Sequence, residues 1–230
     1  MRGFTDIHAH FLYGVDDGPR SKAEMEGMLD AAYADGITSL FATPHATPGV
    51  YPFNHALMRQ RLTEARAYCQ AKGYQMQLYA GAEIMFTPAL ERIAMERQLP
   101  TLADSASILL EFVPDISYWE LDSAIDMLTR SGYSVILAHF ERYACLFHRK
   151  NAYRLKDRYD LRYQVNCNSI LNSKGIIKDY HLGMWLKSEL VDFVATDAHD
   201  TRRRPFQINA AYAALRQKYR KAYVDMLVGI

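Results

Sequence analysis

Histidines and carboxylates recur at the ends of short apolar runs in this 230-residue sequence. The segment Asp6–His10 contains His8 and His10, spaced two residues apart, and Thr196–His199 repeats that spacing with an aspartate and a histidine. Residues two apart point to the same face of a β-strand, so we predict that Asp6 shares a face with both histidines. Such a pair can hold zinc, iron or manganese. A polar strand face satisfied by hydrogen bonds is the alternative for either segment alone.

Further candidate ligands follow apolar runs inside the chain. His45 comes after Pro44, and Glu83, Glu111 and His139 each directly follow such a run. A carboxylate after a buried run is costly unless it is paired or bound to a metal. The loop Asp16-Asp17-Gly18 reads either as a turn or as the source of one more carboxylate ligand. The residues alone therefore nominate this loop together with His8, His10, His45, Glu83, Glu111, His139, Asp197 and His199.

A set of five histidines and at least three carboxylates can hold more than one cation. Multi-metal sites suit phosphate ester hydrolysis, because one ion generates hydroxide at neutral pH while the others neutralise phosphate oxygens. Arg142 lies three residues after His139, and Arg204 ends a triple arginine before Pro205. Guanidinium groups bind phosphate through two parallel hydrogen bonds, so both arginines are candidate phosphate ligands. A solvated basic loop is the alternative for the triple arginine.

Short apolar runs alternate with amphipathic stretches, which predicts repeated βα units and a parallel sheet. The carboxyl ends of parallel barrel strands converge on one face, where residues far apart in sequence meet. Helices are predicted at 21–34, 55–72, 118–131, 179–190 and 206–219, the first with Ser21 and Glu24 as a capping box. Strands are predicted at 5–10, 38–43, 75–83, 108–112, 134–139, 164–168 and 193–197.

Composition limits the classes of protein that fit. The chain has 27 Lys and Arg against 26 Asp and Glu, a balance without an overall pull on nucleic acid or on anionic membranes. Three cysteines without a C-x-x-C pair favour a reducing compartment. No signal peptide or membrane-spanning run is visible. We expect a cytoplasmic protein with one domain over residues 1–230, no nucleic-acid partner and no membrane insertion.

The order of these motifs resembles the PHP (polymerase and histidinol phosphatase) superfamily from Asp6 to Pro205. Asp-x-His-x-His marks the superfamily. The segments Tyr13–Gly18 and His139–Tyr143 narrow the resemblance to the bacterial manganese-dependent protein-tyrosine phosphatases of capsule and exopolysaccharide loci. Phe140 stands where that family usually has proline.

The resemblance implies an α/β fold, a distorted seven-stranded (β/α)7 TIM-like barrel of the PHP type with three divalent metal ions. The ions implied are Mn²⁺, with Fe and Zn as alternatives. One ion would be held by His8, His10, Glu83 and Asp197, the second by Glu83, Glu111 and His139, and the third by Asp16, His45 and His199. Arg142 and Arg204 would be the catalytic residues that bind the phosphate. The choice of Arg204 over Arg203 rests on the Pro205 that follows it.

The resemblance further implies a phosphoric monoester hydrolase that acts on phosphotyrosine. A metal-bound hydroxide would attack phosphorus directly, and the partner would be a bacterial tyrosine kinase that controls polysaccharide synthesis. The residues themselves exclude a cysteine-dependent phosphatase. Such an enzyme needs an arginine six residues after its cysteine, and the positions six residues after the three cysteines hold Gln75, Asn151 and Ser173. Two alternatives remain, a small-molecule phosphatase for histidinol phosphate or a nucleotide, and a non-catalytic regulatory barrel.

Overall fold

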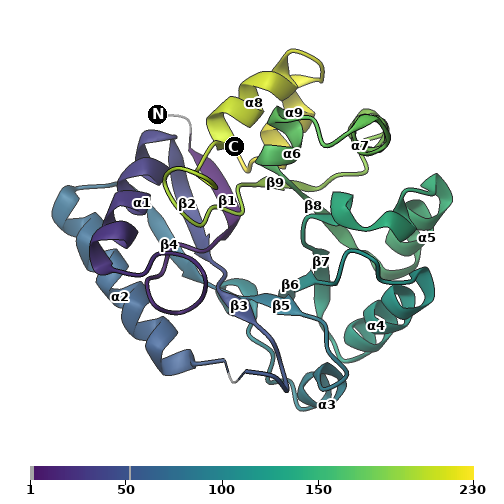
Figure 1. Ribbon diagram of the computed structural model, residues 1–230, viewed down its shortest axis with the longest axis horizontal. Helices are drawn as coiled ribbons and strands as arrows, with labels where there is room; N and C mark the ends of the chain where they lie inside the picture. The colour runs from purple at the N-terminus through teal and green to yellow at the C-terminus, as the bar shows by residue number, and fades with distance from the viewer. Residues whose placement is uncertain (1–2, 52) are drawn as a thin grey trace.

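Parallel β-strands curl around the centre of the molecule, and helices lie outside them (Figure 1). This computed structural model describes residues 3–51 and 53–230, with Arg149 described by its backbone only. The strands pair in two parallel sheets, of order β1-β2-β4 and β3-β5-β6-β7-β8-β9. Their bounds are β1 Phe4–Ala9, β2 Ile37–Ala42, β3 His45–Ala46, β4 Gln77–Ala80, β5 Glu83–Met85, β6 Ser107–Glu111, β7 Ser134–Leu137, β8 Arg162–Asn166 and β9 Phe193–Ala195.

The chain passes from one sheet to the other at two short breaks between strands. Thr43 and Pro44 separate β2 from β3, and proline cannot donate a backbone hydrogen bond to the ladder. Gly81 and Ala82 separate β4 from β5, and a Cβ at Gly81 would lie 2.5 Å from the Leu102 side chain. The single strand predicted at 75–83 is therefore divided between β4 and the start of β5. The predicted α/β class with a curled parallel sheet is confirmed, whereas the hydrogen bonding gives nine strands in the described residues.

The first and last strands also meet. The backbone N–H of Asp197 donates to the carbonyl of His8 at 2.8 Å, and that of His10 donates to Ala198 at 2.8 Å. A bridge between Ala9 and Ala198 lies between these bonds. Residues from the two ends of the chain are thus fixed side by side at the carboxyl edge of the sheet.

The helices are α1 Lys22–Ala34, α2 His55–Lys72, α3 Leu90–Met95, α4 Tyr118–Arg130, α5 Arg149–Tyr159, α6 Cys167–Leu171, α7 Ile176–Lys187, α8 Ile208–Arg216 and α9 Lys221–Leu227. All five predicted helices are present, α2 with the predicted bounds and the other four with shifted ends. Helices α3, α5, α6 and α9 were not predicted. The strand predicted at 164–168 ends at Asn166, because Cys167 and Asn168 already belong to α6. None of the described helices combines the length and apolarity needed to cross a bilayer.

Side-chain caps fix three of the helix starts, and at α2 the cap is Asn54, which accepts from the Leu57 N–H. Ser21 accepts a hydrogen bond from the Glu24 N–H, as predicted, while the Glu24 carboxylate bonds the N–H of Arg20 rather than that of Ser21. Ser117 and Glu120 form a complete capping box at α4. Each cap satisfies backbone donors that the first helical turn leaves free.

Apolar side chains pack on both faces of the sheet. The larger cluster fills the space between strands and helices, with Leu110 and Leu137 among its members. A smaller inner cluster contains Ile7, Leu109 and Ile136. Leu109 lies two residues before Glu111 on β6 and so shares its face. The inner cluster therefore forms the floor beneath the polar residues at the carboxyl edge.

Asp6 does not share the face of His8 and His10, contrary to the prediction. Its carboxylate accepts hydrogen bonds from Thr196 Oγ1 at 2.5 Å and from the backbone N–H of Thr196 at 3.1 Å. An irregularity in the β1–β2 register between Asp6 and Ala9 interrupts strict alternation, so Ile7 joins the inner cluster. Burial raises the pKa of Asp6 to about 6 even though these hydrogen bonds oppose the rise. Asp6 thus acts as a cross-link between β1 and β9.

We expect Thr196→Val to destabilise the fold by about 1–3 kcal/mol, because it leaves a buried carboxylate oxygen and the Ala198 N–H without partners. The free energy of unfolding in urea measures this loss. Thr63→Val, at an exposed position of α2, is the matched control and should stay within about 0.5 kcal/mol. Equal stability of the two variants would contradict the cross-link.

Candidate metal centre

The carboxyl edge of the sheet gathers imidazoles and carboxylates into three overlapping groups. Within each group one ligand atom per residue lies within 4.8 Å of the others. The groups are His8, His10, Glu83 and Asp197; His10, Asp17, His45 and His199; and His45, Glu83 and Glu111. Eight of the nine residues expected as ligands thus lie in one place, including His139 beside the third group.

Glu83 lies at the centre of the three groups. Its Oε2 is 3.2 Å from His8 Nε2, 3.2 Å from His10 Nε2 and 3.1 Å from His45 Nδ1. Its Oε1 is 2.7 Å from His139 Nε2. Burial alone would raise the pKa of Glu83, but the charge of His8 and the hydrogen bonds of the other imidazoles hold it well below the usual range. Glu83 is therefore placed to bridge two cations.

Hydrogen bonds at the far side of two rings show that the residues fit a cation. His8 Nδ1 faces Gln164 Oε1 at 3.1 Å, and His10 Nδ1 faces Asp16 Oδ2 at 2.7 Å. Each Nδ1 donates to its oxygen, so a neutral ring directs its Nε2 lone pair inward. The two Nε2 atoms lie 3.2 Å apart and both face Glu83. Converging acceptors of this kind require a positive charge between them.

Protons supply that charge when no metal is bound. Burial disfavours the charged imidazoles of His10 and His139, yet the hydrogen bonds that they donate to carboxylates outweigh it and raise the pKa of each to about 9. For His45, Asp17 and Glu83 overcome burial in the same way and raise the pKa to about 11. Protons and metal ions therefore compete for the same atoms.

We expect metal binding to the metal-free protein to release protons at neutral pH, since His10 and His139 are protonated below about pH 9. Apparent Mn²⁺ affinity should rise with pH through about 9 and beyond, because the pKa of His45 is about 11. Because the pKa of His10 is higher in the folded protein than in the unfolded chain, its proton stabilises the metal-free fold. This stabilisation is complete below pH 6.5 and is lost as the pH rises through about 9. Calorimetry in buffers of different ionisation enthalpy counts the protons. A binding heat independent of buffer would contradict the prediction.

The structure corrects one expected ligand. Asp16 was expected beside His45 and His199, but Asp17 occupies that place, with Oδ1 3.2 Å from His199 Nε2 and 3.4 Å from His45 Nε2. The Asp16 carboxylate instead accepts from His10 Nδ1 and from the N–H groups of Gly18 and His45. The loop passes close to β1 at Gly18, where a Cβ would lie 2.2 Å from the His10 carbonyl. Asp16 orients an imidazole rather than joining the group.

Two amides that sequence reasoning missed connect the groups. His8 Nδ1 and the His139 N–H both bond Gln164 Oε1, at 3.1 and 2.9 Å. Gln164 Nε2 donates to Asn166 Oδ1 at 2.8 Å, and Asn166 Nδ2 donates to Asp197 Oδ2 at 2.7 Å. The His139 N–H can only donate, so it fixes the direction of the whole chain and places the His8 proton on Nδ1. Paired amides on a buried strand were the available sequence signal.

His139 and Asp197 both have left-handed backbone conformations, with φ of 31° and 54°. Such angles are unfavourable for residues with a Cβ and persist where the surroundings hold them. Here the His139 N–H bonds Gln164, and the Asp197 N–H bonds the His8 carbonyl. The backbone turns so that each side chain faces the centre of the three groups.

Two arginines meet at Asp197. Arg142 Nη2 lies 3.0 Å from Asp197 Oδ2, and Arg204 Nη2 lies 2.7 Å from Oδ1. Burial would raise the pKa of Asp197, but its cationic surroundings hold it far below the usual range. Arg202 and Arg203 are exposed, and Asp200 accepts from their backbone N–H groups. Arg204 is thus the member of the triple arginine that reaches the centre.

A parallel α/β sheet with a buried imidazole and carboxylate cluster at its carboxyl edge defines a metal-dependent hydrolase. The family model for capsular polysaccharide synthesis, CpsB/CapC, matches residues 4–229. The chain belongs to this family.

Relatives agree with this assignment. The chain is 28% identical to the tyrosine-protein phosphatase CpsB of Streptococcus pneumoniae over 93% of its length and 90% of that protein. It is 29% identical to the tyrosine-protein phosphatase YwqE of Bacillus subtilis, and the match covers 93% of this chain and 84% of YwqE. A solved structure from work on YwqE and CpsB, described as metal-dependent tyrosine phosphatases, superposes with a TM-score of 0.86 at 28% identity, covering 97% of this chain and 90% of that one. An organophosphorus hydrolase from Deinococcus radiodurans shares the fold alone, with a TM-score of 0.63 at 14% identity.

Proposed function

We propose that this protein is a metal-dependent protein-tyrosine phosphatase of capsule or exopolysaccharide synthesis. The observation that carries the proposal is the convergence of the three ligand groups beside Arg142 and Arg204. Membership of the CpsB/CapC family and the relatives' activity support it. Its substrate would be phosphotyrosine on a protein, and a bacterial tyrosine kinase is the partner that we propose.

We propose three divalent ions, with Mn²⁺ as the first candidate and Fe or Zn as alternatives. His8, His10, Glu83 and Asp197 would hold one ion, and Glu83 would bridge to a second held with Glu111 and His139. The third would lie among Asp17, His45 and His199. Bound ions would supply hydroxide at neutral pH and neutralise phosphate oxygens. The grouping of ligand atoms and the inward lone pairs support this assignment.

The two arginines would hold the phosphate. Both guanidinium groups already contact one carboxylate, Asp197, and each keeps further N–H donors for phosphate oxygens. The thiols are unsuited to attack, because burial raises the pKa of Cys69 and Cys145 to about 11 and also raises the pKa of Cys167 well above its usual value. The chain's own groups therefore bind and orient the phosphate and offer no covalent nucleophile of the cysteine type.

A cavity beside the ligand groups suits an aromatic leaving group. It has a volume of about 540 Å³, and Asp17, His45 and Glu111 line its polar side. The side chains of Phe53 and Met85 form its apolar wall. A tyrosine ring could lie against that wall while its phosphate reaches the arginines, which supports a phosphotyrosine substrate.

We also propose a barrel of seven strands in a single domain over residues 1–230. The support is that β2 and β3, like β4 and β5, are continuous except for two residues each. Cytoplasmic location is part of the proposal, because the described cysteines are free thiols.

The test is hydrolysis of a phosphotyrosine peptide by protein loaded with Mn²⁺, assayed beside histidinol phosphate and a nucleotide monophosphate. We expect the highest kcat/KM with the peptide. Preference for either small molecule would replace the proposal with a small-molecule phosphatase. Protein purified without chelator that contains no transition metal would favour the regulatory barrel.

We expect Arg142→Lys to raise KM for phosphotyrosine about tenfold with a smaller effect on kcat, because a single ammonium cannot form two parallel hydrogen bonds to phosphate. Steady-state kinetics separates the two constants. Arg202→Lys, at the exposed start of the triple arginine, is the matched control. A KM as low as that of the control would contradict the assignment of Arg142 to the phosphate.

A further inference from the structure

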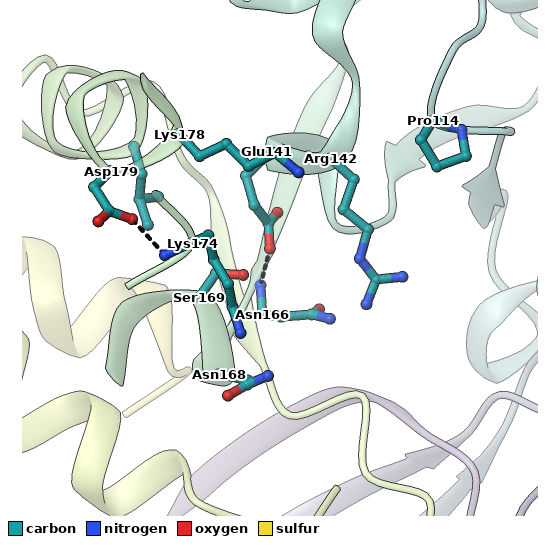
Figure 2. Close-up of a pocket in the computed structure, with 10 residues that line it drawn as sticks. Pro114, Glu141, Arg142, Asn166, Asn168, Ser169, Lys174, Lys178 and Asp179 are labelled. Atoms are coloured by element: carbon teal, nitrogen blue, oxygen red, sulfur yellow. Dashed lines mark hydrogen bonds between the residues drawn. The ribbon is translucent and has the colours of Figure 1, made fainter. Parts of the chain in front are cut away.

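A second pocket adjoins the phosphate-binding side of the metal centre. It has a volume of about 260 Å³ and is lined by residues of β8, α6 and α7 and of the loop after β7. Arg142 and Asn166 belong to both places: they line this pocket, and their side chains contact Asp197. Figure 2 shows Glu141 between the Arg142 side chain and the segment that carries Lys174 and Lys178. A group bound here would lie directly beside a phosphate held by Arg142.

One carboxylate oxygen in this pocket lacks a donor. Glu141 is only 5% exposed, and its Oε1 accepts from the Asn166 N–H at 3.1 Å. Its Oε2 is buried and has no hydrogen-bond partner among the described residues. A buried charged oxygen without a partner is costly, so the pocket is built for a ligand or water that donates an N–H or O–H.

Two ammonium groups lie at the rim of this pocket. In the described part of the chain, neither Lys174 nor Lys178 forms a salt bridge, although both line the pocket. Asp179 also lines the pocket, accepts from Ser173 Oγ and from the Lys174 N–H, and interacts electrostatically with Lys174. Arg142 is already paired with Asp197. The positive charge left for a ligand at the rim is therefore mainly that of Lys178, with a part from Lys174.

We propose that this pocket is a subsite for an acidic side chain next to the phosphotyrosine of the substrate peptide. The acidic side chain would pair with Lys174 and Lys178, and a peptide N–H would donate to Glu141 Oε2. A small anion alone fits less well, because it carries no donor for Glu141 Oε2. A peptide supplies both groups at once. This inference rests on the proposed function and deepens it.

The experiment is a glutamate scan. In an otherwise neutral phosphotyrosine peptide, each of the positions flanking the phosphotyrosine is replaced in turn by glutamate, and kcat/KM is measured with free phosphotyrosine alongside. We expect about a fivefold gain at one or two positions, the effect of two solvent-accessible ion pairs, and a smaller gain at high salt. Lysine at the same position should lower kcat/KM.

The double variant Lys174→Ala/Lys178→Ala should lose the glutamate gain while its kcat/KM for free phosphotyrosine stays unchanged. Lys187→Ala, at the exposed end of the same helix, is the matched control and should keep the gain. The subsite alone would be overturned if glutamate raised kcat/KM at no position. It would also be overturned if the double variant lost kcat/KM equally on the neutral peptide and on free phosphotyrosine. Wild-type protein inactive on free phosphotyrosine would overturn the proposed phosphatase and the subsite with it.

Discussion

Glu83→Ala should lower kcat/KM for phosphotyrosine by about a thousandfold or more and reduce the metal content of the purified protein. The carboxylate contacts four imidazoles from three strand ends, so its removal takes a ligand from two of the three groups at once. Losses of this size accompany removal of groups that stabilise charge in a transition state. Activity assays combined with elemental analysis measure both effects. His139→Ala and Asp197→Ala should behave in the same way.

Two controls separate lost chemistry from lost fold. Glu83→Gln keeps the side-chain shape but removes the charge, so it should fold and still lose metal. Glu91→Ala, at an exposed position of α3, should leave metal content and kcat/KM unchanged. A Glu83→Ala protein that turns over at a near-normal rate would refute the bridging assignment.

Gln164→Leu should weaken metal binding about 10- to 100-fold without changing any proposed ligand, as loss of the groups that orient metal ligands generally does. The substitution removes the acceptor for His8 Nδ1 and for the His139 N–H, and the donor to Asn166. The stranded His139 N–H should also cost about 1–3 kcal/mol of stability. Metal titration and urea unfolding measure the two effects.

A spectroscopic readout isolates the positioning role of Gln164. In the metal-free protein, ¹⁵N chemical shifts of the His8 ring should place its proton on Nδ1, and Gln164→Leu should mix the two tautomers. Gln164→Glu keeps an acceptor for His8 but sets an oxygen against Asn166 Oδ1, so it should preserve the tautomer and still disturb Asp197. Gln70→Leu, on the exposed face of α2, is the surface control. An unchanged His8 tautomer in Gln164→Leu would contradict the role.

The sequence predicted the residues that follow apolar strands because parallel topology brings such positions to one edge. His45, Glu83, Glu111 and His139 each follow a run of this kind, and the structure gathers all four. Local pattern and general topology were enough for that result. The same reasoning located the curled parallel sheet.

The parts of the site and the fold that were not predicted depend on contacts between residues far apart in the sequence. Asp16 and Asp17 are adjacent and chemically identical, so their residue type does not show which one faces His199. The irregular register after Asp6 turned that residue toward Thr196. Phe140, where the family usually has proline, packs fully buried against Tyr163 and Trp185, and Arg142 still reaches Asp197.

The meeting of β1 with β9 has a consequence for how the protein is made. His8 and His10 are synthesised almost first, whereas Asp197 and His199 leave the ribosome about 190 residues later. A nascent chain that lacks its last strand has His45, Glu83 and Glu111 but not Asp197 and His199, so two of the three ligand groups stay incomplete. Full loading with metal should therefore follow translation, and a chain interrupted before its last strand should be inactive.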